Sequence, residues 1–335
     1  MMAIPLFPEY KRISLEDRET VQKYLSMTRQ EMSECTFSGL YIWQNSFEIG
    51  LSHIDSALLV RTFYPDGRQS CMMPFGATDP VAVVKDMCNI LKESKITHPA
   101  AGSKEMLQKP ELYFISHPYG KTDTDAESPD LAKGLETAGF QVAQDRDNWD
   151  YVYLVKDLTA LEGTKYHSKK KAMNKCLSHY RCEFEEMTMK NIEECIDFQT
   201  EWCRMMRCSE DPSLVGENLA TDIALQEFHK LGFIGGVVRI DGKIQAITLG
   251  ERLNDSTAVV HFEKANPAID GLYQVINNWF CANTLKEYEF VNREQDLGKP
   301  GLRKAKESYR PHHMVEKYVA RMKEYVMQSA AASSQ

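Results

Sequence analysis

The sequence predicts an α/β protein built from two domains, each a mixed, mostly antiparallel sheet flanked by helices. At 335 residues the chain is too long for one ordinary core and fits two domains of about 150 residues. Segments with helical and strand-like spacing of apolar residues alternate along it, which is typical of an α/β fold. The second half repeats the order of the first, so we expect a duplicated domain at 1–149 and 150–326 and a disordered tail at 327–335.

Composition limits the classes of function. A hydrophobic share of 43% and a charged share of 26% are those of a soluble globular protein. The formal net charge of -8 argues against non-specific binding to nucleic acid, so any polyanion site must be a local basic patch. No apolar signal region and no run of roughly 18 apolar residues is present, so we expect a cytoplasmic protein without a membrane span.

The number and spacing of the cysteines also indicate a cytoplasmic protein. The chain has 9 cysteines, an odd number, and no CxxC pair, which predicts reduced thiols. The spacing of Cys203, Cys208 and His229 is poor for zinc, so we predict no metal ligand.

Local signals give the elements of the first half. Ser14 and Asp17 have the spacing of a capping box, and a Tyr-Pro-Asp-Gly turn joins two apolar runs. A stripe at helical spacing follows Asp79-Pro80; it consists of Val81, Val84, Met87, Cys88 and Leu91. The predicted elements are a helix from 15, a hairpin across 64–67, a helix from 80, a strand at 111–118, a helix ending at Gly139 and a strand at 150–158.

The elements of the second half are more sharply marked. Gly232 ends a helix, and Asp241-Gly242 is a two-residue hairpin turn. The predicted helices are 169–180, 191–206, 216–232, 271–287 and 301–309, and the predicted strands are 233–240, 243–253, 257–265, 288–294 and 314–322.

Two features at strand ends could carry chemistry. The loop from Asn266 to Gly271 leads into a helix whose free NH groups could hold an anion or a carbonyl, with a coenzyme A pyrophosphate as one candidate. Its single glycine and Asp270 favour the alternative of an ordinary capped helix. Carboxylates at the ends of adjacent strands could take a proton from an attacking group or hold an ammonium, or they could simply be solvated.

Two basic segments could bind phosphate. The segment 165–175 carries five lysines and no acid, and the helix near 301–309 has basic residues along one face. Either is alone typical of a solvated amphipathic helix, but together they could form a phosphate-binding wall, which would make binding depend on salt.

Segments 150–176 and 292–311 resemble two signatures of the phosphatidylglycerol lysyltransferase C-terminal domain family. The first signature runs Asp-Tyr-Val-Tyr, Leu, then Gly-Lys-Lys-Tyr-His and a Lys-Arg-Asn triplet; here Lys171 stands where Asn is usual and Cys176 where an aromatic is. LYIW at 40–43 and MPFG at 73–76 extend the resemblance over nearly the whole chain.

The resemblance implies two tandem GNAT-like domains. It implies kinship with transferases that move an aminoacyl group from a charged tRNA to a lipid head group, and more distantly with Fem-type aminoacyltransferases. The membrane half of the lysyltransferases has no counterpart in this sequence, so we do not expect a lipid acceptor.

Combining the strand-end acids, the basic segments and the resemblance gives a predicted site. It comprises the catalytic residues Glu263, Asn292 and Asp296; the donor- or phosphate-binding residues Lys165, Lys169, Lys170, Gly271, Tyr273, Arg303, Lys304 and Lys306; and the acceptor-binding residues Tyr166, His167 and Glu294.

We expect acyl or aminoacyl transfer from a charged tRNA or a coenzyme A thioester to the amine or hydroxyl of a small acceptor. Two alternatives remain: an N-acyltransferase that uses acyl-coenzyme A, and a non-catalytic module that binds an amino-acid-like ligand or a phosphorylated partner. The transferase hypothesis requires Lys169, Glu263 and Arg303 to converge on one hollow.

Overall fold

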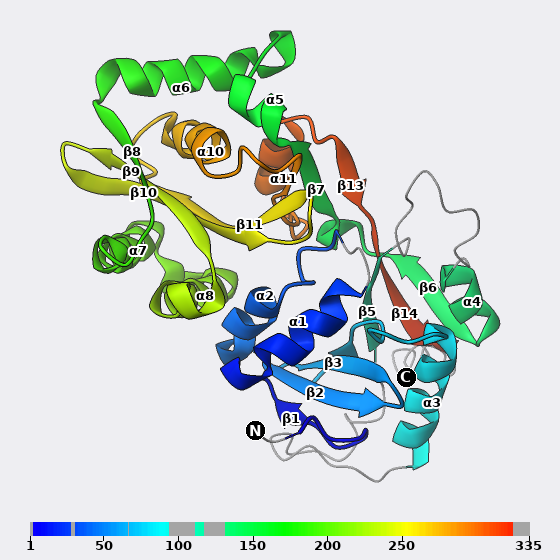
Figure 1. Cartoon of the computed structure of the whole chain (residues 1–335). Coiled ribbons are helices and arrows are strands. Elements are labelled where there is room, and N and C mark those ends of the chain that lie inside the picture. Colours follow the sequence, from blue (N-terminus) through cyan, green and yellow to red (C-terminus); the bar gives the residue numbers. More distant parts are fainter. Residues whose placement is uncertain (1–2, 28–30, 66, 94–110, 117–130, 324–335) are drawn as a thin grey trace. The chain divides into compact units, whose positions relative to one another are not determined.

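The computed structural model describes residues 3–27, 31–65, 67–93, 111–116 and 131–323, which form two compact units (Figure 1). Unit 1 consists of the described residues before 31, between 46 and 146, and from 316 onward. Unit 2 consists of residues 31–45 and 147–315. The predicted division into continuous segments therefore differs from these units at 31–45, at 147–149 and after 315. The tail predicted at 327–335 lies outside the described residues.

Unit 1 is built on a seven-stranded sheet. In sheet order its strands are β1 (Lys11–Arg12), β2 (Glu48–Ile54), β3 (Ala57–Phe63), β4 (Gln69–Cys71), β5 (Glu111–Ser116), β14 (Lys317–Met322) and β6 (Phe140–Gln144). Neighbouring strands are antiparallel except β4 and β5, which are parallel. The predicted hairpin is the β3–β4 pair. The helices of this unit are α1 (Arg18–Ser26), α3 (Pro80–Glu93) and α4 (Leu131–Thr137).

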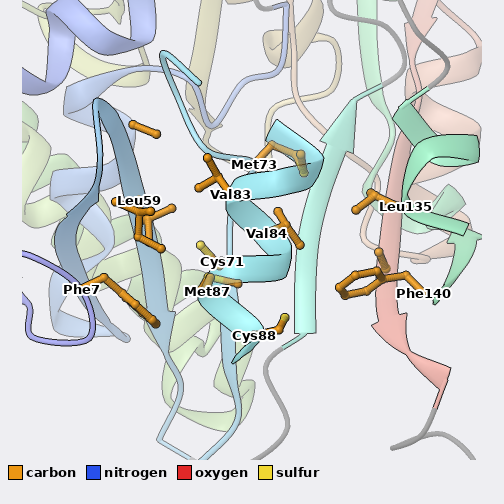
Figure 2. Packing of buried hydrophobic residues seen from close by; sticks show 13 residues of the cluster. Phe7, Leu59, Cys71, Met73, Val83, Val84, Met87, Cys88, Leu135 and Phe140 are labelled. Atoms are coloured by element: carbon orange, nitrogen blue, oxygen red, sulfur yellow. The ribbon is translucent and has the colours of Figure 1, made fainter. Parts of the chain in front are cut away.

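Helix α3 fills the core of unit 1 (Figure 2). Its predicted stripe is confirmed, since Val84, Met87 and Cys88 are buried and Val81 and Leu91 pack beside them. The rest of the cluster comes from the sheet and from α4, and includes Leu59, Cys71, Met73, Leu135 and Phe140. The predicted capping box is also present, with the Asp17 carboxylate accepting from the Ser14 backbone NH at 2.9 Å.

Unit 2 has a second seven-stranded sheet. In sheet order its strands are β13 (His313–Val315), β7 (Asp150–Leu154), β12 (Phe290–Asn292), β11 (Thr257–Ala265), β10 (Lys243–Arg252), β9 (Ile234–Ile240) and β8 (Cys182–Glu186). Only β11 and β12 run parallel within it. The predicted hairpin turn is confirmed at Asp241-Gly242, where both residues have positive φ.

Helices cover both faces of this sheet. Those of unit 2 are α2 (Phe37–Ile42), α5 (Val155–Ala160), α6 (His167–His179), α7 (Ile192–Met206), α8 (Pro212–Gln226), α9 (Phe228–Leu231), α10 (Leu272–Asn283) and α11 (Pro300–Glu307). Helices α5, α6 and α10 lie on one face, and α7 and α8 lie on the other (Figure 1). The predicted fold class, mixed and mostly antiparallel sheets flanked by helices, is therefore confirmed.

Two predicted strands differ from the structure. The strand expected at 150–158 ends at Leu154, because Val155 and Leu158 bury one face of helix α5 instead. The strand expected at 314–322 is divided between the two sheets. Val315 pairs with β7 in unit 2, whereas Lys317 pairs with β5 in unit 1, so the chain changes sheet at Glu316. The alternation of apolar and polar residues predicts a strand, but it does not predict which of the two sheets the strand joins.

The prediction that the cysteines are reduced is wrong for one pair. Cys203 and Cys208 form a disulfide, whereas the other seven cysteines are free. Helix α7 ends at Met206, and Arg207 then adopts a left-handed conformation that turns the chain back. The turn brings the two cysteine Cα atoms to 5.2 Å, within the range that a disulfide requires.

A β-bulge in β11 decides which side chains face α10. The register between β10 and β11 shifts at Gly250, which pairs with Val260 while Leu249 pairs with Phe262, so His261 is the extra residue. Because of this insertion, Val260 and Glu263 point to the α10 side of the sheet. Without the bulge, the alternation of side chains along β11 would have pointed Glu263 to the face opposite α10.

Gly250 is required by the close approach at this bulge. A Cβ on Gly250 would lie 2.3 Å from the Val259 carbonyl oxygen, whereas a Cβ on the helical residue Gly301 would meet nothing within 4 Å. We expect Gly250→Ala to lower the free energy of unfolding by about 1–3 kcal/mol. Gly301→Ala should leave it unchanged or raise it by up to about 1 kcal/mol. Urea unfolding checks both variants, and equal midpoints would contradict the prediction.

Candidate functional site

The sheet of unit 2 opens between β11 and β12. These parallel strands pair over three residues and part after Asn292. Beyond this point β11 continues to Ala265, while Arg293 donates its backbone NH to Tyr151 of β7. The strands therefore diverge, and the side chains of Glu263 and Arg293 meet across the opening.

An ion pair spans the opening. Arg293 Nη2 lies 2.9 Å from Glu263 Oε1, and each side chain is 13% exposed. Asn277 of α10 donates its Nδ2 to Glu263 Oε2 at 3.0 Å, so each carboxylate oxygen accepts one hydrogen bond. Two buried atoms of this set, Arg293 Nη1 and Asn277 Oδ1, have no hydrogen-bond partner among the residues that the structure describes. The set thus offers one unused donor and one unused acceptor beside a carboxylate.

Two tyrosine rings hold the cations of the opening. The Arg293 guanidinium lies 5.0 Å from the Tyr309 ring centre and 5.7 Å from that of Tyr153. Lys169 of α6 places its amine 4.3 Å from the Tyr309 ring. Such contacts favour a desolvated cation over an aromatic face. Burial and the nearby Arg293 lower the pKa of Lys169.

Lys306 of α11 turns inward to the same place. Its amine donates to the backbone carbonyls of Arg293 and Glu294, and its own carbonyl accepts from the Tyr153 hydroxyl at 2.9 Å. Burial and Arg293 lower the pKa of Lys306 to about 8. A fraction of this amine is therefore neutral near physiological pH.

We call this set the Arg293 cluster; its members are Tyr153, Lys169, Glu263, Asn277, Arg293, Lys306 and Tyr309. It contains three cationic side chains and one carboxylate, so it favours a ligand with a partial or full negative charge. The unused Arg293 donor can hold a carbonyl oxygen or an oxyanion, and the unused Asn277 acceptor can receive an amine or hydroxyl proton.

Only Glu263 of the predicted catalytic residues lies in this cluster. Asp296 is fully buried and accepts hydrogen bonds from Tyr151 at 2.6 Å, from Arg303 at 2.8 and 2.9 Å, and from the Gly298 NH at 2.9 Å. Burial raises its pKa, but the Arg303 and Tyr151 hydrogen bonds lower it to about 2. The expectation that Asp296 takes a proton does not fit these contacts, because so weak a base stays ionised.

Asn292 also has structural partners. Its Nδ2 donates to the Glu31 carbonyl at 2.7 Å and to Asp150 at 3.0 Å, and its Oδ1 accepts from the Glu294 NH at 2.7 Å. Ser33 donates to the same Asp150 carboxylate through both its backbone NH and its hydroxyl. Asn292 therefore ties the end of β12 to β7 and to the segment before α2, in place of the catalytic role that we expected.

Glu294, predicted to bind the acceptor, instead belongs to a buried carboxylate–histidine–carboxylate group. His261 Nδ1 lies 2.7 Å from Glu294 and its Nε2 lies 3.0 Å from Glu251, with the imidazole 3% exposed. Burial lowers the pKa of His261, but the two carboxylates raise it to about 10. The ring is therefore an imidazolium that donates to both acids.

The basic residues near the start of α6 have different surroundings. Lys165 pairs with Asp157 at 3.0 Å, and the buried Tyr166 places its hydroxyl 3.4 Å from the same carboxylate. His167 and Lys170 are exposed. Lys169 is the one residue of this group that reaches the Arg293 cluster.

Among the basic residues of α11, the division is similar. Arg303 bonds Asp296 and also Asp147, at 2.7 Å, so its guanidinium is used in fixing the helix. Lys304 is exposed, and Lys306 alone turns into the cluster. The predicted phosphate-binding wall is thus reduced to two lysines, one from each helix, because acids within the fold take part of the remaining charge.

The loop before α10 is closed to a phosphate. Gly271 has φ +86°, and a Cβ there would lie 2.2 Å from the Ala172 carbonyl oxygen, so α6 packs directly on it. The amides of Ala268 and Leu272 donate to Asn266 and Ile269 within the loop. Of the two alternatives from the sequence, these contacts favour an ordinary helix start over a phosphate loop, although no side chain caps the helix.

Tyr273 lies beside the end of β11. Its hydroxyl interacts with the backbone of Ala265 and with Trp202, and burial raises its pKa. The indole of Trp202 itself donates to the Ala265 carbonyl at 3.0 Å. These contacts give Tyr273 a packing role at the strand end.

A hollow of about 330 Å³ lies elsewhere in unit 2. It is lined by Val155, Lys156, Thr159, Ala282, Lys286, Tyr288 and Glu289. None of the predicted site residues is among them. Of the three residues that the sequence led us to expect around one hollow, Glu263 pairs with Arg293, Lys169 lies over the Tyr309 ring that Arg293 also contacts, and Arg303 binds Asp296 and Asp147, so the three do not converge.

Sequence reasoning missed four members of the Arg293 cluster. They are Tyr153, Asn277, Arg293 and Tyr309. Signals existed for two of them. Arg293 lies next to the last residue of the strand predicted at 288–294, and Asn277 is a polar residue on the buried side of a helix rich in apolar residues.

Membrane-spanning helices and metal sites are two further features that bear on function. In the described part of the chain, none of the helices combines the length and the apolar character needed to cross a bilayer. Within the same residues, no group of three or more histidine, cysteine, aspartate and glutamate side chains is arranged to hold a metal ion.

The chain resembles known proteins over most of its length. The profile of the family described as phosphatidylglycerol lysyltransferase, C-terminal, matches residues 126–321. A conserved protein of unknown function from Bacteroides thetaiotaomicron has 31% identity and a TM-score of 0.81, with 94% of this chain and 99% of that chain covered. No curated protein matches the chain.

Two more distant structures share the fold. The C-terminal domain of a candidate lysylphosphatidylglycerol synthetase from Agrobacterium fabrum has 14% identity and a TM-score of 0.62, with 96% of both chains covered. L-PGS from Bacillus licheniformis has 12% identity and a TM-score of 0.59, with 96% of this chain and 94% of that chain covered. These structures share the fold seen here, and the predicted pair of units, each a mostly antiparallel sheet with helices, is confirmed.

Asp296 makes stability depend on pH in a defined direction. Its pKa falls from an ordinary 3.8 to about 2 on folding, so the stabilisation is present above pH 4 and is lost as the pH falls toward 2. A shift of this size corresponds to about 2.5 kcal/mol. We expect Asp296→Asn to lower the free energy of unfolding at pH 7 by about 2–3 kcal/mol, and to flatten its decline between pH 4 and 2. Urea unfolding at several pH values measures this.

The control for this variant is Asp270→Asn, which removes an exposed carboxylate paired with Lys175 and should change stability little. A wild-type profile that is flat between pH 4 and 2 would contradict the role given to Asp296.

His261 should stay doubly protonated far above the ordinary histidine range. Its raised pKa gives a stabilisation that is complete below pH 6.5 and is lost as the pH rises through about 10. We expect its ring nitrogen signals in ¹⁵N NMR to remain unchanged from pH 6 to 9. The signals are assigned as those missing from His261→Gln. A titration of these signals near pH 6.5 would show that the two carboxylates do not hold an imidazolium.

Proposed function

This chain belongs to the phosphatidylglycerol lysyltransferase C-terminal family, and we propose that it transfers an aminoacyl group from a charged tRNA to the amine or hydroxyl of a small acceptor. The observation that carries this proposal is the pair of unused buried atoms beside Glu263. Arg293 Nη1 is a donor and Asn277 Oδ1 is an acceptor. An aminoacyl group has the complementary pair, because its carbonyl oxygen accepts and its amino group donates.

The proposed geometry follows from these atoms. The donor's carbonyl oxygen accepts from Arg293 Nη1, and its amino group donates to Asn277 Oδ1. The acceptor's nitrogen or oxygen attacks the carbonyl carbon, and the negative charge that develops on the carbonyl oxygen is stabilised by Arg293 and by Lys169. The ester bond to the tRNA ribose then breaks as the new amide or ester bond is kept.

Glu263 is the proposed proton acceptor. Each of its oxygens accepts one hydrogen bond, from Arg293 or Asn277, and so keeps a second lone pair for the proton of the attacking group. The ribose oxygen leaves with a proton, so charge is balanced over the reaction. Asn292, Glu294 and Asp296 are proposed to position the chain that carries Arg293, without touching the substrate.

Coenzyme A thioesters are the weaker donor candidates. The amides of Ala268, Ile269 and Leu272 are engaged within the loop, and the α6 backbone covers Gly271. These contacts leave fewer NH groups and less space for a pyrophosphate than an open glycine-rich loop would. A non-catalytic module is the other rival; it would bind an amino-acid-like ligand at the same atoms without turnover.

The test is transfer of a radiolabelled amino acid from a mixed pool of charged tRNA to a panel of small amines and alcohols, with acyl-coenzyme A as a second donor. We expect Glu263→Gln to lower kcat by about 10²–10⁴-fold and Arg293→Lys to lower it by about 10²–10³-fold. Lys169→Met should have a smaller effect of the same sign.

Lys170→Met is the matched control, because Lys170 lies next to Lys169 on α6 but is exposed. It should keep the wild-type rate. Transfer from acyl-coenzyme A but not from charged tRNA would show that the donor is a thioester. Binding of aminoacyl analogues without transfer to any acceptor would favour the non-catalytic module. A rate unaffected by Glu263→Gln and Arg293→Lys would place the reaction elsewhere.

A further inference from the structure

The hollow of about 330 Å³ in unit 2 is lined by three charged side chains. They are Lys156 of α5, Lys286 shortly after α10 and Glu289 just before β12. All three are exposed to solvent, and within the described part of the chain none of them forms an ion pair. Two ammonium groups and one carboxylate therefore border the same space without neutralising one another.

Two hydroxyl groups and two apolar residues complete the lining. The Thr159 and Tyr288 hydroxyls have no hydrogen-bond partner among the described residues. Burial raises the pKa of Tyr288, although Arg252 nearby opposes this, so the hydroxyl stays protonated and can donate. The remaining lining residues, Val155 and Ala282, are apolar. The hollow thus offers groups of both charges beside a small apolar surface.

Hydrogen bonds fix the backbone that carries these groups. The Val155 NH donates to the Glu289 carbonyl at 3.0 Å, which joins the start of α5 to the segment before β12. Asn278 of α10 donates its side-chain amide to the carbonyls of Leu158 at 2.8 Å and Thr159 at 2.7 Å. The elements around the hollow are therefore held together without a ligand, and a preformed site loses less affinity to ordering on binding.

The charges around the hollow select the class of ligand. A simple anion would pair with the two lysines but would also face Glu289, and a simple amine would face the two lysines. A molecule that carries both a carboxylate and an ammonium group can pair with all three side chains. Sites for small molecules enclose about 300–1,000 Å³, so this hollow suits a small zwitterion.

We propose that this hollow binds a free α-amino acid with an apolar side chain. Lys156 and Lys286 pair with its carboxylate, and Glu289 pairs with its ammonium group. The two hydroxyls of the lining donate to the same carboxylate. Val155 and Ala282 contact the apolar side chain of the amino acid.

The proposed amino-acid site is separate from the Arg293 cluster. Glu289, which lines the hollow, precedes the first residue of β12, whereas Arg293 follows the last residue of the same strand. No member of the Arg293 cluster lines the hollow. The proposal is therefore independent of the transfer reaction, and its test does not require turnover.

The experiment is equilibrium dialysis of the whole protein against radiolabelled L-leucine and, separately, L-phenylalanine. We expect saturable binding of at least one of them, weakened by added sodium chloride because the charged groups are exposed. L-Leucinamide lacks the carboxylate, and N-acetyl-L-leucine lacks the ammonium group. Each should compete about three- to tenfold less well than L-leucine, because each loses ionic contacts.

Variants of the lining locate the binding. Ala282→Phe fills the hollow with a ring and should abolish binding. Lys286→Met and Glu289→Gln should each weaken it about two- to fivefold, the effect of losing one exposed ion pair. Glu287→Gln is the matched control for Glu289→Gln, because Glu287 is also exposed but does not line the hollow. It should bind as the wild type does.

Circular dichroism verifies that each variant is folded. If Ala282→Phe fails to fold, the charge variants and the two competitors still decide the question. The proposal is overturned if the wild-type protein binds neither amino acid saturably, or if L-leucinamide and N-acetyl-L-leucine compete as well as L-leucine. It is equally overturned if folded Ala282→Phe keeps the binding, which would place it elsewhere, or if Glu287→Gln loses as much affinity as Glu289→Gln.

Discussion

The short pairing of β11 with β12 is the constraint on which the functional half of unit 2 depends. Three paired residues leave the end of β11 without a neighbour on one side, and polar groups there must find partners other than a strand. The bulge at His261 turns Glu263 toward α10, where Asn277 donates a hydrogen bond to it. Arg293 pairs with the same carboxylate from across the opening and neutralises its charge.

The residues after β12 are held by a succession of ion pairs, each with at least one buried partner. Arg293 pairs with Glu263, Glu294 with His261, and Asp296 with Arg303. Each pair ties the same short segment to a different element of unit 2. Breaking a buried pair by removing one partner is costly, so the segment has few other conformations available. A donor atom such as Arg293 Nη1 is thereby fixed in place before any ligand arrives, and such preorganisation is what electrostatic catalysis requires.

Much of the architecture could be read from local patterns. The helix stripe after Asp79-Pro80 and the Asp241-Gly242 hairpin are set by neighbours within a few residues, so the sequence alone indicates them. The division of the last strand at Glu316 depends instead on which partners are in reach. The same holds for the Cys203–Cys208 bond, which needs the left-handed turn at Arg207.

The site was harder to predict than the fold. Strand-end position singled out Glu263, which lies in the Arg293 cluster, but it gave equal weight to Asp296, whose hydrogen bonds come from residues up to 145 positions away. The lysines of α6 illustrate the same limit. Lys165 and Lys169 differ by four positions, yet one meets Asp157 and the other meets an aromatic ring. The sequence shows how many charged side chains a segment carries, but the tertiary structure decides which of them an opposite charge neutralises.

The order in which the chain is synthesised has a consequence for unit 1. Its strand β14 comes from the very end of the described chain, and it lies between β5 and β6 in the finished sheet. A nascent polypeptide on the ribosome therefore lacks an inner strand of its earlier-made unit until the segments of the other unit have been synthesised. Unit 2, whose segments lie between residues 31 and 315, can assemble earlier. The later-made unit is thus the one that can mature first, and a chain terminated before Lys317 would leave the earlier one with two unpaired edges exposed to aggregation.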